Sequence, residues 1–251
     1  MNQKVEIIYE DNDLVVCRKM SGIAVHTAKL VQQDLEGQLR NYFAAKGEEN
    51  TQVFVIHRLD QPVEGVMVFA RNKRVAAELS RQSRERNMSK CYLALAQGVF
   101  AEPTGVLEDY LLQDKKNTSQ VVKQGTQGAK YARLKYEVER VYKAEDFSND
   151  GQMGKQDRQI SKSLQPYRDI SLVRVQLDTG RHHQIRVQMA HAGHPLIGDR
   201  KYNPGPIWGY FPVGLCAVKI AFVHPTTGKN MEFEVKPRGQ AFQFVCQDHI
   251  G

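Results

Sequence analysis

Short runs in which apolar and polar residues alternate recur along the chain, and this pattern predicts many strands and few helices. Apolar residues at 7–9 and 14–17 flank an Asp- and Asn-rich segment at 10–13, which is typical of a β-hairpin. Further strands are predicted at 52–56, 65–70, 91–97 and 171–177, and within the alternating segment 105–142. Strands therefore account for most of the predicted regular structure.

Helical patterns occur in three places. Residues 30–46 indicate a helix, residues 73–86 indicate a basic helix, and residues 182–193 have helix-compatible side chains closed by a glycine. The polar segment 143–168 is predicted to be a long surface loop. Because no internal repeat or clean linker divides the chain, we expect a single α+β domain over residues 1–251.

Composition narrows the class of protein. With 251 residues, of which 41% are hydrophobic, the chain can bury a sizeable core. No apolar run reaches about 18 residues and the N-terminus lacks the pattern of a signal peptide, so we expect a cytoplasmic protein that does not enter a membrane. The four cysteines lie far apart without a C-x-x-C pair, which argues against both a disulfide framework and a thiolate zinc site.

The charge distribution suggests an anionic partner. Lys and Arg total 35 against 28 Asp and Glu, a net charge of +7 that suits a polyanion but also many other soluble proteins. Between residues 71 and 90 the excess is concentrated in seven basic side chains: Arg71, Lys73, Arg74, Arg81, Arg84, Arg86 and Lys90. This stretch is either a solvated helix face or a surface that contacts phosphates.

Four of the eight histidines fall between residues 182 and 194, at His182, His183, His191 and His194. A zinc-binding helix normally offers two histidines four residues apart with a glutamate between them, and these spacings do not supply it. We therefore expect no metal site, and we expect His191 and His194 to face solvent or to cap the helix.

Asp60 stands out among the carboxylates because it directly follows the predicted strand at 52–56. A carboxylate held against an arginine stays ionised even when it is partly buried, and Arg186, after the strand at 171–177, could supply that charge. Such a carboxylate can act as a base or a nucleophile. The same pairing is equally consistent with a structural salt bridge.

Three segments closely resemble, in order, the signature motifs of the RluA-type pseudouridine synthases: "HRLD" at 57–60, "KCYLALAQG" at 90–98 and "TGRHHQIRVQMAHAGHPLIGDRKY" at 179–202. Residues 7–26 and 217–235 also resemble the family's opening hairpin and closing strands. The resemblance implies the pseudouridine synthase fold, in which helices and loops flank a mixed, mostly antiparallel sheet. It also implies an isomerase that converts uridine in RNA to pseudouridine.

The resemblance assigns roles to individual residues. Asp60 matches the catalytic aspartate, which acts while the uracil is detached from C1′, rotated and rejoined through C5; whether it attacks the sugar or abstracts a sugar proton stays open. Tyr92 matches a tyrosine that stacks on the base, and Arg186 matches the arginine that pairs with the aspartate. Arg58 matches an arginine that enters the RNA stack where the target leaves it. The other expected substrate-binding residues are His57, Lys90, Arg181 and His183.

The resemblance also bears on partners. The expected partner is RNA, either 23S ribosomal RNA or transfer RNA, and the isomerisation involves no redox change, so no cofactor or metal is expected. The first recognised strand begins near Met1, so we expect no N-terminal S4 domain, and we expect a monomer. Target recognition is then expected from the catalytic domain, through the basic 71–90 stretch, the loop at 143–168, Arg181 and Arg200.

Two other classes remain possible from the sequence. One is a non-catalytic RNA-binding or RNA-folding protein with the same fold, which the presence of Asp60, Tyr92 and Arg186 disfavours. The other is a metal-dependent phosphodiesterase built on the histidine cluster. This class is disfavoured because the chain lacks carboxylates at ligand spacing. One departure from the family pattern also matters, because Val63 and Glu64 stand where small hydroxyl residues are common. We expect Glu64 near the RNA path, where it would repel phosphates and alter substrate choice.

Overall fold

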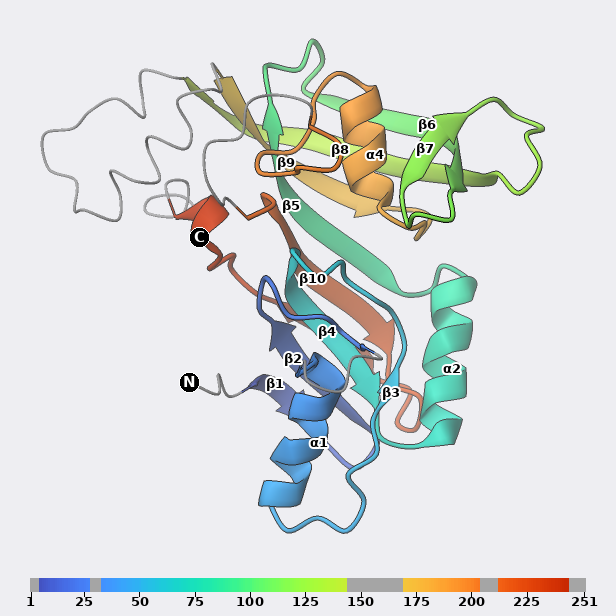
Figure 1. Ribbon diagram of the computed structural model, residues 1–251. Coiled ribbons are helices and arrows are strands. Elements are labelled where there is room, and N and C mark those ends of the chain that lie inside the picture. Colours follow the sequence, from blue (N-terminus) through green and yellow to red (C-terminus); the bar gives the residue numbers. More distant parts are fainter. Residues whose placement is uncertain (1–4, 28–32, 144–168, 204–211, 244–251) are drawn as a thin grey trace, which may run out of the picture. The chain divides into compact units, whose positions relative to one another are not determined.

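The computed structural model describes residues 5–27, 33–143, 169–203 and 212–243 (Figure 1). By its internal contacts the chain separates into two compact units. The first unit comprises Met1–Lys90 and Ala217–Lys236, and the second comprises Cys91–Cys216 and Pro237–Gly251. The expectation of a single domain stays a prediction.

Sheet strands form the frame of the first unit. They are β1 (Glu6–Glu10), β2 (Leu14–Lys19), β3 (Phe54–Val55), β4 (Glu64–Ala70), β10 (Leu215–Val223, which begins in the second unit) and β11 (Asn230–Glu234). The order is β1-β2-β4-β10, with β3 paired to β4 and β11 paired to β10. The hairpin predicted at 7–17 is confirmed, because the Asp11 carboxylate accepts hydrogen bonds from the backbone N–H groups of Asp13 and Leu14 and so closes its turn.

The described residues of the first unit include the helices α1 (Leu35–Ala45) and α2 (Lys73–Arg84). The side chain of Asp34 accepts a hydrogen bond from the N–H of Gly37 at 2.8 Å and begins α1, so this helix starts later than the predicted residue 30. Asn72 caps α2 in the same way through the N–H of Val75. The basic helix predicted at 73–86 is therefore confirmed to within two residues.

The core of the first unit lies between α2 and the sheet. Val75 and Leu79 of α2 are fully buried in a cluster formed with apolar residues of β2, β4 and β10: Leu14, Val16, Val66, Val68, Ile220 and Phe222. The side chain of Gln82 extends this contact, because its amide binds both the N–H and the C=O of Val223 at 2.9 and 2.8 Å. Burial of the apolar face directs most of the charged residues of α2 toward solvent.

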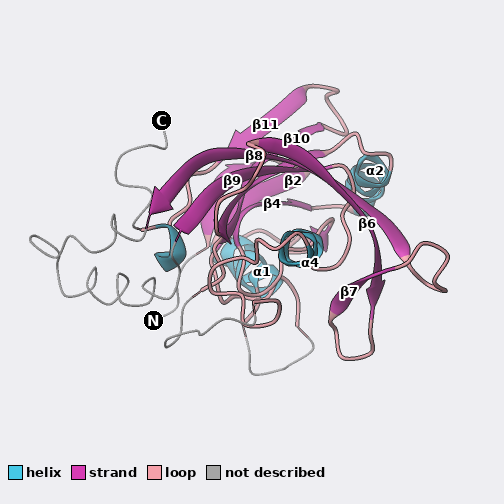
Figure 2. Cartoon of the chain, turned by 90° about the horizontal axis from the view of Figure 1, so that it is seen from above, coloured by secondary structure: helices cyan, strands magenta, loops and turns pink. Residues whose placement is uncertain are grey.

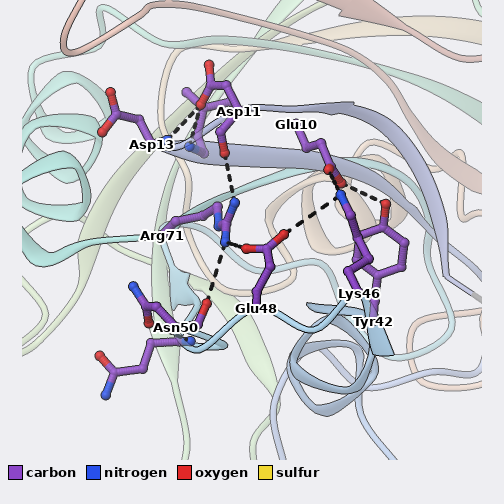
Figure 3. Close-up of polar contacts among 10 residues, drawn as sticks. Glu10, Asp11, Asp13, Tyr42, Lys46, Glu48, Asn50 and Arg71 are labelled. Atoms are coloured by element: carbon purple, nitrogen blue, oxygen red, sulfur yellow. Dashed lines mark hydrogen bonds and ion pairs between the residues drawn. The ribbon is translucent and has the colours of Figure 1, made fainter. Parts of the chain in front are cut away.

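Arg71 directly follows β4 and joins the β1–β2 turn to the segment after α1 (Figure 3). Its guanidinium donates to the carbonyl of Asp11 at 3.0 Å, pairs with Glu48 and stacks on the ring of Phe43 at 4.0 Å. Only 9% of Arg71 is exposed. The expectation that Arg71 contributes to a phosphate-contacting surface is therefore wrong, because its guanidinium is bound to groups of the same unit.

Within its described residues, the second unit contains a five-stranded antiparallel sheet. Its strands are β5 (Ser89–Gln97, which begins in the first unit), β6 (Thr104–Gln113), β7 (Ser119–Val122), β8 (Lys130–Lys143) and β9 (Asp169–Leu177), in the order β5-β9-β8-β6-β7. Helix α4 (Gln184–His191) packs on β6 and β7 (Figure 2), and a short 3₁₀ helix covers Gln240–Phe242. The predicted α+β class is confirmed, whereas residues 144–168, most of the predicted long loop, lie outside the described residues.

Candidate active site

The segment between β3 and β4 carries the expected catalytic aspartate. Arg58 is exposed, the Leu59 side chain points inward with 7% exposure, and Asp60 is half-buried. The N–H of Val63 donates to the carbonyl of Asp60 at 3.0 Å and closes a turn directly after the carboxylate. The chain thus presents an arginine and an aspartate from one short, closed loop over residues 57–63, called the Asp60 loop below.

Lys19, at the end of β2, anchors the Asp60 loop from inside the unit. Its ammonium donates to the carbonyls of Met20, Gln61 and Val63 at 3.1, 3.0 and 2.5 Å, and its side chain is 0% exposed. Burial lowers the pKa of Lys19 to about 7, although the negative charges of Asp60 and Glu64 oppose that shift. Lys19 is not among the residues predicted from the sequence, and its only signal there is a lysine that ends an apolar strand.

Three further hydrogen bonds connect the same two segments. The hydroxyl of Ser21 donates to the carbonyl of Pro62 at 2.7 Å, and the N–H of Gly22 donates to the carbonyl of Gln61 at 2.8 Å. The side-chain amide of Gln61 donates back to the carbonyl of Gly22 at 3.0 Å. Gly22 has φ +88°, a conformation that favours glycine, so the Ser-Gly pair after β2 is needed to hold the Asp60 loop.

His57 lies at the start of the Asp60 loop in a desolvated position. Its Nε2 accepts a hydrogen bond from the N–H of Val68 at 3.3 Å, while its Nδ1 is buried without a hydrogen-bond partner within the described part of the chain. Burial and the charge of Lys90 hold the pKa of His57 well below 6.5. His57 is therefore a neutral imidazole near pH 7, with Nδ1 carrying the proton.

Lys90, another expected substrate-binding residue, is half-buried at the start of β5. Burial lowers its pKa to about 8, and its ammonium lies 3.5 Å from the hydroxyl of Ser83 on α2. Glu64 differs from the expectation, because it is only 2% exposed. A carboxylate this deeply buried does not itself contact a phosphate, and the expected place of Glu64 near the RNA path stays a prediction.

In the second unit, Tyr92 lies on β5 opposite Val175 of β9 and is 6% exposed. Its neighbour Cys91 is half-buried, with its sulfur 3.7 Å from the guanidinium of Arg174. The pairing of β5 with β9 extends over seven residues and fixes the backbone on which the expected base-stacking tyrosine lies.

Arg186 is held by a carboxylate that the sequence analysis missed. Its Nε and Nη2 donate to the two oxygens of Asp199 at 2.7 Å each, with the two side chains 7% and 0% exposed. Asp199 also accepts a hydrogen bond from the N–H of Lys201 at 3.1 Å. Two parallel hydrogen bonds fix the plane of the guanidinium. The expected pairing of Arg186 with Asp60 joins residues of different units and stays a prediction.

Two of the clustered histidines, His182 and His183, contact each other and neighbouring hydroxyl groups. His182 and His183 stack with ring centroids 3.7 Å apart, and His183 begins α4 with φ 53°. Nδ1 of His183 lies 2.6 Å from the Tyr202 hydroxyl, and Nδ1 of His182 lies 2.9 Å from the hydroxyl of Ser119 on β7. Within the described ranges, no three His, Cys, Asp or Glu side chains are grouped so that they could hold a metal ion.

Other expected contact residues of the second unit occupy different environments. Arg181 is half-buried and its Nε donates to the carbonyl of Tyr131 at 2.8 Å, whereas Arg200 is exposed. His191 is exposed as expected, but His194 stacks on the ring of Phe100 at 3.7 Å. None of the helices in the described ranges is long and apolar enough to span a bilayer.

The fold and these motifs agree with known proteins. The model of a family described as RNA pseudouridylate synthase matches residues 13–191. The chain is 30% identical to tRNA pseudouridine synthase C of Vibrio parahaemolyticus, covering 91% of this chain and 88% of that protein. It is 31% identical to ribosomal large subunit pseudouridine synthase D of Neisseria meningitidis, covering 92% of this chain and 57% of that protein.

A solved structure shares the fold. The structure of human RNA pseudouridylate synthase domain containing 4 superimposes with a TM-score of 0.72 at 20% identity, over 96% of this chain and 92% of the human chain. The predicted pseudouridine synthase fold is thereby confirmed. Because the family model covers well over half of the sequence, the chain belongs to the RNA pseudouridylate synthase family and is an isomerase that acts on RNA.

Proposed function

We propose that the protein converts uridines of structured ribosomal or transfer RNA to pseudouridine, with Asp60 as the catalytic carboxylate. The observation that carries this proposal is the anchoring of the Asp60 loop by a buried ammonium. Lys19 donates to two carbonyls that follow Asp60 in the loop, those of Gln61 and Val63. A carboxylate held in a fixed loop is what nucleophilic attack or proton abstraction at the sugar requires.

Tyr92 and Arg58 suit the handling of an extruded base. A base inside an RNA helix is unreachable, so it must leave the stack at a cost of roughly a few kcal/mol and be held against flat or apolar groups. Tyr92 supplies such a ring on a rigid strand. Arg58 is exposed beside Asp60, and a planar guanidinium that stacks on bases suits the vacancy left in the RNA.

Arg186 completes the proposed catalytic set as the partner of Asp60. Its two bonds to Asp199 orient the guanidinium before substrate binds, which lowers the entropic cost of using it in a second interaction. Arg181, Lys90, His57 and His183 are the remaining proposed substrate contacts. Because His57 is neutral near pH 7, its role in the proposal is to donate a hydrogen bond from Nδ1 and not to neutralise phosphate.

The test is tritium release from C5-labelled uridine in ribosomal and transfer RNA transcripts. Wild-type protein is expected to release tritium on at least one transcript, and Asp60→Asn is expected to release none while it still binds RNA. Glu102→Gln, an exposed substitution in the second unit, is the matched control and should behave as wild type. Equal release by Asp60→Asn would exclude Asp60 as the catalytic residue. Silence of the wild type on both, with tight binding, would favour a non-catalytic RNA-binding protein.

A further inference from the structure

The segment between β9 and α4, residues 178–183, is called the β9–α4 loop below. Strand β9 ends opposite Leu134 of β8, whereas β8 continues past that point toward its own first residue. The loop binds the backbone there: the carbonyl of Arg133 accepts hydrogen bonds from the N–H groups of the first two loop residues, and the carbonyl of Tyr131 accepts one from Nε of Arg181 at 2.8 Å. The loop therefore supplies partners to backbone groups that β9 does not reach.

Gln184, the first residue of α4, holds this loop from inside and is 3% exposed. Its Oε1 accepts hydrogen bonds from the hydroxyl of Thr179 at 2.8 Å and from the backbone N–H of Arg181 at 2.9 Å. Its Nε2 donates to the carbonyl of Arg133 at 3.1 Å. The Thr179 hydroxyl in turn accepts from the N–H of Arg133 at 2.8 Å. One carboxamide thus joins the start of the loop, the backbone of Arg181 and the edge of β8.

The partners of Gln184 fix the orientation of its carboxamide. The backbone N–H of Arg181 is only a donor, and the carbonyl of Arg133 is only an acceptor. A flipped amide would place its NH₂ group against the N–H and its oxygen against the carbonyl, so only one orientation satisfies both partners. The site therefore requires both ends of the amide, which an apolar side chain of similar size cannot supply.

Arg181 is held at two points, because its backbone N–H binds Gln184 and its Nε binds the carbonyl of Tyr131. A guanidinium carries five N–H donors, four of them on the two terminal nitrogens. These terminal nitrogens have no partner within the described part of the chain, and they reach solvent from a half-buried side chain. Such a fork suits the oxygens of a phosphate, to which it can donate two parallel hydrogen bonds.

We propose that Gln184 is a positioning residue for Arg181: its buried carboxamide ties the backbone of Arg181 to the edge of β8 and so holds the terminal nitrogens of Arg181 in place for a phosphate of the RNA. This inference rests on the proposed function, in which Arg181 contacts the substrate. A fork that is fixed before RNA arrives loses less conformational entropy when it binds, so the clasp contributes to affinity without touching the RNA.

The test is a double-mutant cycle, read as the Kd for ribosomal and transfer RNA transcripts in filter binding. Arg181→Ala is expected to raise Kd about tenfold, the effect of one charge-assisted contact. Gln184→Met removes the carboxamide at similar volume. It should raise Kd about fivefold in the wild-type background and less than about twofold in the Arg181→Ala background. Gln124→Met, the same substitution at an exposed position of the same unit, is the control and should leave Kd unchanged.

The two backgrounds distinguish positioning from a merely structural role. If Gln184 only supports the fold, Gln184→Met weakens binding by the same factor with and without the Arg181 side chain, and this outcome overturns the proposal. An unchanged Kd for Gln184→Met overturns it as well. So does an unchanged Kd for Arg181→Ala, because no contact would then remain for Gln184 to position.

Thr179 provides a second route to the same test if Gln184→Met does not fold. Thr179→Val keeps the shape of the side chain but removes the hydroxyl that donates to Gln184, whereas Thr179→Ser keeps the hydroxyl. We expect Thr179→Val to raise Kd about threefold, only while Arg181 is present, and Thr179→Ser to stay within about twofold of wild type. Equal weakening by Val and Ser would overturn the proposal, because the hydroxyl would then be irrelevant.

Tritium release supplies a readout of a different kind. Because Arg181 and Gln184 act on binding, Gln184→Met should raise KM and leave kcat within about twofold of wild type. A fall in kcat at unchanged KM would overturn the positioning role. A wild-type protein that binds RNA but releases no tritium would remove the proposed catalytic function, while the binding cycle would still decide the role of Gln184.

Discussion

Arg186 and Asp199 form a buried ion pair with two hydrogen bonds of 2.7 Å. Asp199→Asn keeps the size of the side chain but removes the buried negative charge that accepts two hydrogen bonds from the guanidinium. Loss of one partner of a buried pair typically costs about 3–5 kcal/mol, so we expect the free energy of unfolding to fall by about 3 kcal/mol or more in urea titrations. The control is Asp114→Asn, at an exposed position in a turn. This variant should change the free energy of unfolding by less than about 0.5 kcal/mol.

The same variant separates folding from catalysis. If Arg186 acts on the reacting site, tritium release by Asp199→Asn should fall by at least tenfold at temperatures where the variant is still fully folded. A stable variant with unchanged activity would show that orientation by Asp199 is dispensable, and it would weaken the role proposed for Arg186.

His57 should make the protein sensitive to acid. Its folded pKa lies well below the ordinary 6.5, so below pH 6.5 the unfolded chain binds a proton that the folded chain refuses. The stability contributed by neutral His57 is therefore complete above pH 6.5 and is lost as the pH falls, at up to about 1.4 kcal/mol per pH unit. His57→Gln, which does not titrate, should remove this part of the slope between pH 6.5 and 5. An unchanged slope would contradict the assignment of His57 as a desolvated, neutral imidazole.

At the scale of elements, Arg71 joins three segments of the first unit: the β1–β2 turn, the end of β4 and the stretch after α1 (Figure 3). Lys46 extends the network, since its ammonium pairs with Glu10, which also accepts a hydrogen bond from the Tyr42 hydroxyl at 2.7 Å. The hairpin and α1 are thus held together by polar contacts.

Arg71→Lys tests whether the forked shape matters. A lysine keeps the charge but lacks the planar fork that reaches Glu48 and the Asp11 carbonyl together. We expect the free energy of unfolding to fall by about 2 kcal/mol, because partly buried acceptors lose their donor. Arg84→Lys on the exposed end of α2 is the control and should change it by less than about 0.5 kcal/mol. Equal stability of the two variants would show that the network contributes only through its charge.

Elements were predictable where their signals are local. The hairpin and α2 follow from neighbouring residues, since Asp11 and Asn72 bind backbone groups within three positions. Lys19 binds Gln61 and Val63 more than 40 residues away, so no local pattern shows its role. The predicted strand at 52–56 shortens to Phe54–Val55 because only these residues pair with β4.

The candidate residues also divide into those that a local motif locates and those that depend on contacts between distant positions. The motifs located Asp60, Tyr92 and Arg186, whose environments the structure describes. Asp199 was missed because its role depends on a contact 13 residues away across a turn. The burial of Glu64 was not predicted, because the family resemblance locates a position along the chain and does not show how far its side chain is exposed.

At the scale of the whole molecule, only some of the basic residues behind the net charge of +7 are available to bind phosphates. Arg71 is buried, and Arg81 is paired with both Glu78 and Glu85. Exposed residues of the basic stretch that are not in such pairs are Lys73, Arg74, Arg84 and Arg86. The surface available to phosphates is therefore smaller than the sequence count suggests.

Salt dependence of RNA binding tests which cations contact phosphates. Each phosphate contact on duplex RNA or DNA contributes a slope of about 0.9 in log affinity against log salt. If Arg74 and Arg84 each contact one phosphate, the double variant Arg74→Ala/Arg84→Ala should lower the slope by about 1.8, measured by filter binding between 50 and 200 mM salt. Arg81→Ala should change it by much less, because Glu78 and Glu85 already neutralise Arg81. Equal effects of these substitutions would mean that α2 acts through its overall charge, and no change in either slope would place the RNA contacts on other elements.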